Sequence, residues 1–318
     1  MPHTFDLLVV GDANPDIVLG PLRSPLAFGQ REQLVDTGVL TLGGSGAIMA
    51  CGAARLGLDV AFAGRVGDDD AGRFVRAALA DRGVNTDALV LDPELSTPLT
   101  AVVTDGDDRA ILTAPGTLGA TCGDDIPDAL LADCRHVHAA SYFLMPKLAD
   151  ALPGLLRTAR GHGATTSLDT NDDPSGEWRS AGLDEVLAVT DILLPNAQEA
   201  RALAGPTARS LYEAAARLAA IGPLVVVKDG ADGAVTHDGI ALSRTPAIPV
   251  RPKDTVGAGD SFDAGFVAAV LAGLPTARAL ELAAACGALS TRAHGGTAAQ
   301  PTWDEAVAAL TDNGKNHS

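Results

Sequence analysis

The sequence is poor in aromatic residues and in positive charge. Only 3% of its 318 residues are aromatic although 47% are hydrophobic, so the core must consist mainly of Ala, Val and Leu, as in helix-covered parallel sheets. Lys and Arg number 23 against 40 Asp and Glu, a formal net charge of −17. This balance argues against nucleic acid and against an anionic membrane surface as partners. It leaves open a small anionic ligand held by local N–H groups and a metal ion.

Cysteine is also scarce, and long apolar runs are missing. The four cysteines, Cys51, Cys122, Cys134 and Cys286, form no Cys-X-X-Cys pair, so we expect buried free thiols in a reducing compartment. The first residues lack the basic segment and apolar run of a signal peptide. No apolar run approaches 18 residues without a charge or a glycine. We therefore expect a cytoplasmic protein that does not span a membrane.

The chain does contain a regular alternation of short apolar runs and amphipathic segments. The runs predict buried strands and the segments predict helices. Their alternation predicts an α/β fold whose parallel sheet is covered by helices on both faces, in one large domain or two ordinary ones. The predicted strands include Leu7–Val10, Val60–Ala63, Val137–Ala140, Thr166–Asp169, Ile192–Leu194 and Leu224–Val227, and the predicted helices include Ser45–Leu56, Asp70–Arg82, Leu211–Ala220 and Thr276–Arg292.

Polar clusters follow several of these strands. They are Gly11–Asp16, Asp169–Asp173, Asn196–Glu199 and Lys228–Gly233. Ligands of parallel sheets bind beyond the carboxyl ends of the strands, so the clusters predict one cleft along that edge. The first cluster is not Gly-X-Gly-X-X-Gly, which counts against a nicotinamide enzyme.

Two segments depart from the alternation. The stretch from Asp16 to Leu42 is not helical and contains weak strand patterns at Ile17–Leu19 and Gln33–Val35. The segment Thr97–Thr113 predicts a hairpin with its turn at Asp105–Asp108. We expect these segments to pair into a small sheet beside the main one.

The stretch Asp254–Phe266 carries the most specific pattern, DTVGAGDSFDAGF. Gly257, Ala258 and Gly259 let backbone N–H groups approach a charged ligand, and apolar residues behind them recur at helical spacing. A helix start offers unpaired N–H donors to a phosphate or a developing oxyanion. Asp260 follows directly, as a base that takes a proton from an attacking alcohol would. The structural alternative is a capped loop-to-helix junction with a solvated Asp.

This stretch resembles the C-terminal signature of the ribokinase-like sugar kinases, of the phosphofructokinase B type. The resemblance extends from Gly11 to the Gly295-Gly296 pair, nearly the whole chain. It implies that residues 1–318 form a single ribokinase-like domain, a three-layer α/β sandwich with a mostly parallel central sheet. A small β lid would comprise about residues 14–42 and 97–113. The resemblance also implies ATP and Mg²⁺, with Asp260 as general base and the N–H groups of the glycine loop holding the negative charge.

Several residues are candidates for binding the acceptor. Asn14 and Asp16 are two apart in extended chain, so both side chains can hold neighbouring hydroxyls, although an Asx-turn is the structural alternative. The resemblance implies that Asp16 binds the sugar. Gly43 and Gly44 open a helix and could let its backbone approach a ligand, with simple helix packing as the structural alternative. Ile48 stands where relatives usually have a sugar-binding Asn, so ribose and fructose should be poor acceptors. We expect an acceptor with an apolar edge or without a hydroxyl at that point; the structural alternative is that Ile48 turns into the helix core and touches no ligand.

Other residues are candidates for the nucleotide and its metal. Asn196 and Glu199 fit a helix cap, but the resemblance implies that they organise Mg²⁺ through water. The segment Lys228–Gly233 fits a tight turn, and by resemblance Lys228, Gly230 and Gly233 bind the nucleotide together with Gly257 and Gly259. By resemblance too, Asp254 and the loop near Gly295 hold a monovalent cation such as K⁺.

Two interpretations of the whole chain compete. The first is an ATP-dependent kinase of a sugar or a sugar-like alcohol, with a nucleoside kinase as a variant of the same chemistry. The second is a ligand-binding protein with a kinase fold that has lost turnover. Asp260 favours the enzyme, because a binding protein has no need of a base, whereas Ile48 favours the second interpretation. Lid edges of relatives often pair, so a homodimer through the lid is a further expectation.

Overall fold

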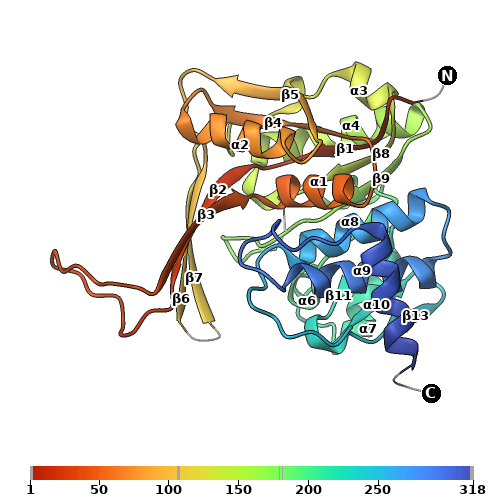
Figure 1. Ribbon diagram of the computed structural model, residues 1–318. Coiled ribbons are helices and arrows are strands. Elements are labelled where there is room, and N and C mark those ends of the chain that lie inside the picture. The colour runs from red at the N-terminus through yellow and green to blue at the C-terminus, as the bar shows by residue number, and fades with distance from the viewer. Residues whose placement is uncertain (1–2, 106–107, 179, 181, 316–318) are drawn as a thin grey trace.

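The computed structural model describes residues 3–105, 108–178, 180 and 182–315 of the chain. Within these residues the chain forms a nine-stranded sheet and a separate four-stranded sheet (Figure 1). The predicted turn residues Gly106 and Asp107 lie outside the described residues. In the described part, no helix combines the length and the apolar character needed to cross a membrane.

The main sheet has the strand order β13-β12-β11-β10-β9-β8-β1-β4-β5. All neighbours from β11 to β5 are parallel, and β12 and β13 add an antiparallel edge. The strands are β1 (Phe5–Val10), β4 (Val60–Gly67), β5 (Asn85–Asp92), β8 (Cys134–Ala139), β9 (Thr165–Leu168), β10 (Ile192–Leu193), β11 (Leu224–Lys228), β12 (Ala234–His237) and β13 (Leu242–Thr245).

Helices cover both faces of this sheet, which confirms the predicted three-layer arrangement. On β1, Leu7 and Val9 join one hydrophobic core, whereas Leu8 and Val10 join the other. This alternation follows from the two-residue period of a strand buried on both faces. The first core packs α1 (Ser45–Arg55), α2 (Asp70–Ala80), α8 (Ala258–Leu271), α9 (Thr276–Ser290) and α10 (Trp303–Lys315), and the second packs α3 (Asp128–Ala132), α4 (Pro146–Gly161), α5 (Leu183–Leu187), α6 (Ala197–Ala204) and α7 (Leu211–Ala219).

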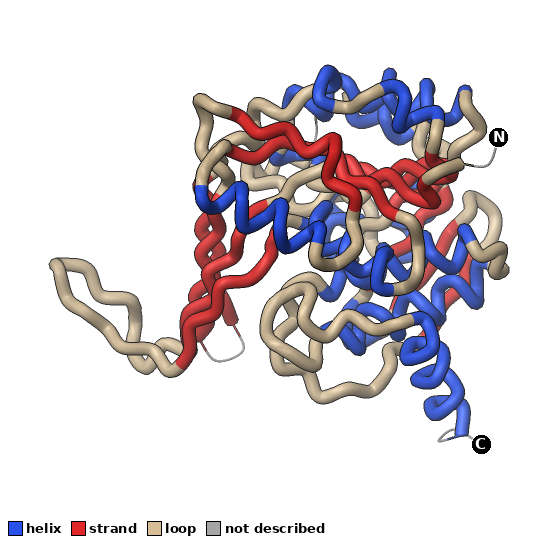
Figure 2. The backbone as a smooth tube through the Cα atoms, turned by 45° about the horizontal axis from the view of Figure 1, so that its top comes forward, coloured by secondary structure: helices blue, strands red, loops and turns tan. Residues whose placement is uncertain are grey.

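The second sheet projects from one side of the sandwich, and the loop of residues 21–36 extends beyond it (Figures 1 and 2). Its strand order is β3-β2-β6-β7, with β2 and β6 parallel and the outer pairs antiparallel. The strands are β2 (Asn14–Gly20), β3 (Thr37–Gly43), β6 (Leu99–Asp105) and β7 (Asp108–Ala114). Since β2 begins four residues after β1 ends, the acceptor candidates of β2 lie where the two sheets meet.

One strand prediction was wrong, and one strand was missed. The strand expected at Gln33–Val35 lies instead at β3, where Asn14 pairs with Gly43 and Asp16 with Thr41. The Gln33 side chain is occupied in the exposed loop, where its carbonyl oxygen accepts a hydrogen bond from the Ala27 N–H at 2.7 Å. Strand β5 was not predicted, because polar residues interrupt its apolar pattern. It is fixed by parallel pairing with β4, a contact of the whole fold rather than of the local sequence.

Candidate active site

The site is organised by the start of helix α8. Gly257 caps the helix in a left-handed conformation, with φ of 73°, and a Cβ on it would lie 2.6 Å from the Gly296 Cα. Only glycine fits both the conformation and the space. The first N–H groups of α8 have no acceptor within the helix, although Ala258 donates a long 3.3 Å hydrogen bond to the Thr255 carbonyl. The helix start therefore presents donors and the positive dipole end to a ligand.

Asp260 lies in the first turn of α8 and is only 9% exposed. Burial raises the pKa of its carboxyl to about 8, and the nearby carboxylates of Asp169 and Asp12 add to the shift. The ammonium of Lys228 opposes it. A general base is most effective with a pKa near the working pH. The environment of Asp260 therefore suits proton abstraction better than that of a solvated carboxylate.

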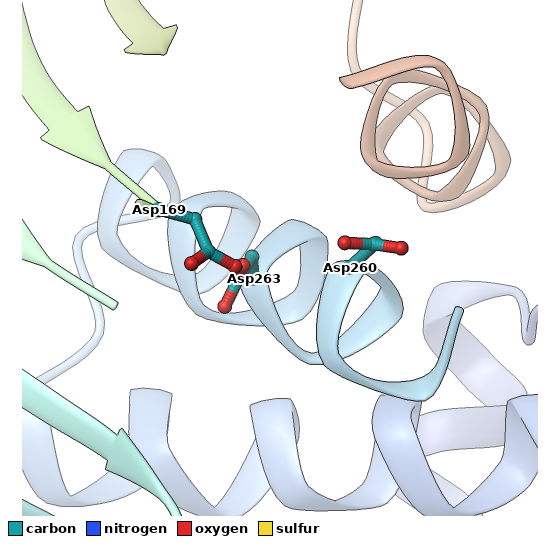
Figure 3. Close-up of side chains that lie close together, drawn as sticks. All are labelled: Asp169, Asp260 and Asp263. Atoms are coloured by element: carbon teal, nitrogen blue, oxygen red, sulfur yellow. The ribbon is translucent and has the colours of Figure 1, made fainter. Parts of the chain in front are cut away.

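A buried ionic cluster lies beside Asp260. The Lys228 Nζ donates to Asp169 at 2.6 Å and to both oxygens of Asp263 at 3.0 and 3.1 Å. Figure 3 shows the carboxyl groups of Asp169 and Asp263 turned toward one another, while Asp260 projects from the first turn of the helix. One oxygen of each of the three carboxyl groups lies within 4.8 Å of the others. The end of β9, the end of β11 and helix α8 thus contribute charged side chains to the same cluster.

The acceptor candidates gather at the start of β2. The Asn14 Nδ2 donates to Asp16 Oδ1 at 2.7 Å and to Thr100 Oγ1 at 3.2 Å. Burial raises the pKa of Asp16 to about 7, against the lowering effect of the Asn14 hydrogen bond. A Cβ on Gly43 would lie 2.0 Å from Asp16 Oδ1. Gly43 therefore leaves the room that the Asp16 carboxyl group occupies.

A second polar network joins the start of α1 to the neighbouring strand ends. Asp12 accepts hydrogen bonds from the N–H groups of Ser45 and Gly46 at 3.2 and 3.0 Å, and from the Ser141 hydroxyl at 2.8 Å. Asn171 donates to the Ser45 hydroxyl at 2.8 Å. Gly44, with φ of 87°, turns the chain into α1 against Asp12. Sequence reasoning placed Asp12 and Asn171 only within polar clusters and missed Ser45 and Ser141 as polar contacts.

Ile48 lies on α1 and is 3% exposed. Its Cγ2 would lie 3.0 Å from a Cβ on Gly257, and its Cδ1 2.6 Å from one on Gly296. The side chain thus packs against the backbone of the helix cap and of the facing loop. It fills the space beside the glycine loop with an apolar group.

Asn196 and Glu199 form a capping box at the start of α6. The Asn196 N–H and its Nδ2 donate to the two Glu199 carboxylate oxygens at 2.7 and 2.5 Å. Burial raises the pKa of Glu199 to about 7, and the Asp169 carboxylate adds to the shift. The cap predicted as the structural alternative is therefore present, and it holds the carboxylate in one orientation.

A cavity of ≈ 550 Å³ adjoins the helix start. Its walls are mainly small or apolar residues, among which Ile248, Val250 and Phe262 are the largest apolar ones. The cavity is also lined by Lys228, Gly230, Gly233, Ala258 and Gly259, all of them nucleotide-site or anion-loop candidates from the sequence. A volume of this size is typical of small-molecule sites.

Two further contacts tie loops to the glycine stretch. The carboxylate of Asp254 accepts hydrogen bonds from the Val256 and Gly295 N–H groups at 3.0 and 2.9 Å. Arg109, on β7, donates from Nη1 to the Thr255 hydroxyl at 3.1 Å. The second sheet is thus hydrogen-bonded to the loop that precedes α8, a contact between residues far apart in the sequence.

The ionisation of Asp260 predicts a pH-dependent stability. Its carboxyl has an ordinary pKa of 3.8 when exposed and about 8 in the fold, so the folded state favours the protonated form. This contribution is fully present below about pH 4 and is lost as the pH rises through about 8. Wild type should therefore lose stability between pH 5 and pH 9, whereas Asp260→Asn should not lose this contribution. The difference in free energy of unfolding, variant minus wild type, should rise by at least about 1 kcal/mol over this range.

Urea denaturation at a series of pH values checks this expectation. Asp150→Asn, at an exposed position on α4, is the control and should show no such trend. If the free energy of unfolding changes with pH in the same way in wild type and in Asp260→Asn, the expectation is wrong.

Known proteins are similar to this chain in sequence and in fold. Residues 4–303 match the pfkB family carbohydrate kinase profile. The ATP-dependent ribose-1-phosphate kinase of Halopiger xanaduensis is 33% identical over 312 residues, which cover 96% of this chain and 98% of the relative. A fructokinase of Klebsiella pneumoniae is 33% identical over 280 residues, 83% of this chain and 90% of the relative.

A solved structure extends this comparison to three dimensions. Arabidopsis thaliana ribokinase complexed with ribose and ATP matches with a TM-score of 0.81 and 26% identity, over 98% of this chain and 99% of that chain. The family match over nearly the whole chain and the similarity of the folds lead to one conclusion. The chain belongs to the pfkB family of carbohydrate kinases.

Proposed function

We propose that this kinase transfers the γ-phosphoryl group of ATP to a hydroxyl of a sugar or sugar-like molecule, with Asp260 as the general base. The observation that carries the proposal is the buried carboxyl of Asp260 in the first turn of a helix opened by glycine. Asp260 takes the proton of the acceptor hydroxyl, whose oxygen then attacks in line. The N–H groups of Gly257, Ala258 and Gly259 stabilise the negative charge that develops beside them.

The cavity beside α8 fits the nucleotide. Small and apolar walls suit a flat base, and Gly230, where an added Cβ would meet nothing within 4 Å, leaves room for backbone approach to a phosphate chain. ATP supplies the phosphoryl group, and Mg²⁺ neutralises part of its charge. Two similar proteins support this assignment, the ATP-dependent ribose-1-phosphate kinase and a putative ribokinase II in complex with ATP and Mg²⁺.

Asn196 and Glu199 are the residues that we assign to Mg²⁺. Their mutual hydrogen bonds fix the Glu199 carboxylate, whose remaining lone pairs can accept from metal-bound water. Magnesium usually keeps several waters and needs few protein carboxylates. One oriented carboxylate at a strand's carboxyl end therefore suffices. We assign K⁺ or a similar cation to Asp254 and the loop at Gly295.

We assign the acceptor to the junction of the two sheets. Asn14 and Asp16 would hold hydroxyls there, Gly43 and Gly44 keep the backbone close, and Ile48 forms an apolar wall near Gly257. The second sheet would close over this junction as a lid and exclude water from the reaction.

The second sheet also suits contact with another copy of the chain. Leu40, Ile111 and Leu112 lie on it with 57%, 57% and 60% exposure. We propose a homodimer through this surface, which sedimentation velocity can test. A monomer at micromolar concentration would contradict the dimer without affecting the catalytic assignment.

Replacement of the base tests the catalytic assignment. Asp260→Asn should lower kcat by about 10²–10⁴-fold, since a general base contributes that much, with little change in the affinity for ATP or acceptor. A coupled assay of ADP release over monosaccharides, sugar acids, polyols and nucleosides supplies the measurement. Asp304→Asn, in the first turn of the distant helix α10, is the control. A near-normal kcat in Asp260→Asn would contradict the assignment of Asp260 as the general base.

Glu199→Gln separates the metal role from the capping role. Glutamine can keep the cap but removes the charge, so the Mg²⁺ concentration needed for half-maximal activity should rise severalfold while acceptor KM changes little. Glu213→Gln is the matched control, because Glu213 stands at the same position of helix α7, which Ser210 caps. Titration of activity against Mg²⁺ decides between the two roles. An unchanged curve would make Glu199 a capping residue alone.

Ile48→Asn tests the acceptor specificity. A buried polar group without a partner costs about 1–3 kcal/mol, so Ile48 should disfavour a hydroxyl at its contact point and Asn should favour one. The ratio of kcat/KM for ribose to that for deoxyribose should rise in the variant, whereas Ile48→Val should leave it unchanged. Efficient phosphorylation of ribose or fructose by wild type, or an unmoved ratio, would refute the idea.

A further inference from the structure

The Lys228 ammonium is hydrogen-bonded to two buried carboxylates. The Lys228 side chain is 11% exposed, while those of Asp169 and Asp263 are 3% and 1% exposed. Both carboxylates lie within 3.1 Å of Nζ. Breaking a buried pair of this kind leaves an uncompensated charge and is costly. The ammonium is therefore held by its two carboxylate partners.

The same ammonium lies beside the catalytic helix start. A Cβ on Gly259 would be 3.6 Å from the Lys228 Nζ and Cδ, so the side chain passes along the glycine loop. Asp263 lies one helical turn after Asp260 on α8. Asp169 directly follows strand β9, and Lys228 ends strand β11. The ion pairs thus connect both strand ends to the helix that carries the base.

The charges around Asp260 make Lys228 decisive for its ionisation. Asp12 follows β1, Asp169 follows β9 and Asp263 shares α8, so the neighbouring carboxylates all oppose a negative charge on Asp260. Ser45, at the start of α1, is a polar neighbour that favours the charge, and Lys228 is the cation that does so. Burial alone would lower the pKa of Lys228, but Asp169, Asp263 and Glu199 raise it overall, so the ammonium stays charged.

We propose that Lys228 is a positioning residue whose clamped ammonium favours the ionised form of Asp260 and fixes the start of α8, instead of binding nucleotide phosphates. The role rests on the proposed function of Asp260 as the base. It also explains the close group of Asp169, Asp260 and Asp263 without a metal ion, because the ammonium supplies the positive charge that these carboxylates need.

The test is the pH profile of kcat/KM for the acceptor at saturating Mg²⁺ and ATP. In Lys228→Met the acid limb should move to higher pH by about one unit or more, since the attraction that favours ionised Asp260 is gone. The KM for ATP should stay within about threefold of wild type. A limb that does not move, or a KM for ATP raised about tenfold or more, as loss of a charged hydrogen bond would produce, overturns the proposal.

A compensated variant guards against a failure to fold. Lys228→Met with Asp169→Asn removes one positive and one negative charge, so the acid limb should return to within about half a unit of wild type. A purely structural role for Lys228 would not return the acid limb to the wild-type position. An acid limb that does not return overturns the proposal. If the single variant does not fold, calorimetric titration of the double variant with ATP decides. Affinity within about threefold supports the proposal, and a loss of about tenfold or more overturns it.

The wild type separates this inference from the proposed function. Absence of acceptor-dependent ADP release with every acceptor class would remove the proposed function and the inference with it. An active wild type whose acid limb is unaffected by Lys228→Met would remove only the inference.

Discussion

The structure depends on the contact between the start of helix α8 and the carboxyl edge of the main sheet. That edge collects polar groups because parallel strands all end there, and α8 presents unpaired N–H donors to it. Two constraints hold the contact in place. Gly257 admits the close approach of Gly296, and the Lys228 ammonium binds Asp263 on the helix and Asp169 on the sheet. Loss of either would weaken the contact between the helix that carries Asp260 and the edge of the sheet.

The architecture and the central part of the site could be predicted from the sequence. The alternation of strand and helix patterns follows from burial on both faces of a parallel sheet, and this signal is local. The stretch from Asp254 to Phe266 combined a glycine loop, a carboxylate and a helical period, so its geometry was predictable as well. The clusters at Asp169 and Lys228 were recognised as strand ends that face one cleft, and the structure confirms that they meet.

What could not be predicted arises from long-range pairing. The register of β3 is set by β2 across the exposed loop of residues 21–36, and β5 is a strand because β4 lies beside it. The pairing of Lys228 with Asp263 joins residues 35 positions apart. Asp263 did carry a signal, since a carboxylate in the middle of an apolar helix demands a partner. The identity of that partner, Lys228, could not be derived from spacing alone.

The hydrogen bond from Arg109 to Thr255 joins the second sheet to the loop that precedes α8. Thr255 lines the nucleotide-sized cavity, whereas Arg109 belongs to the sheet that borders the acceptor residues. An outward swing of β7 must break this bond, so the sheet and the loop do not move independently. A ligand that binds better when the Arg109–Thr255 hydrogen bond is formed stabilises that arrangement of the sheet and the loop. A second ligand that also prefers this arrangement then binds more tightly, and the effect is reciprocal. Under the proposed assignment of the two substrates, their affinities would be linked through the guanidinium of Arg109.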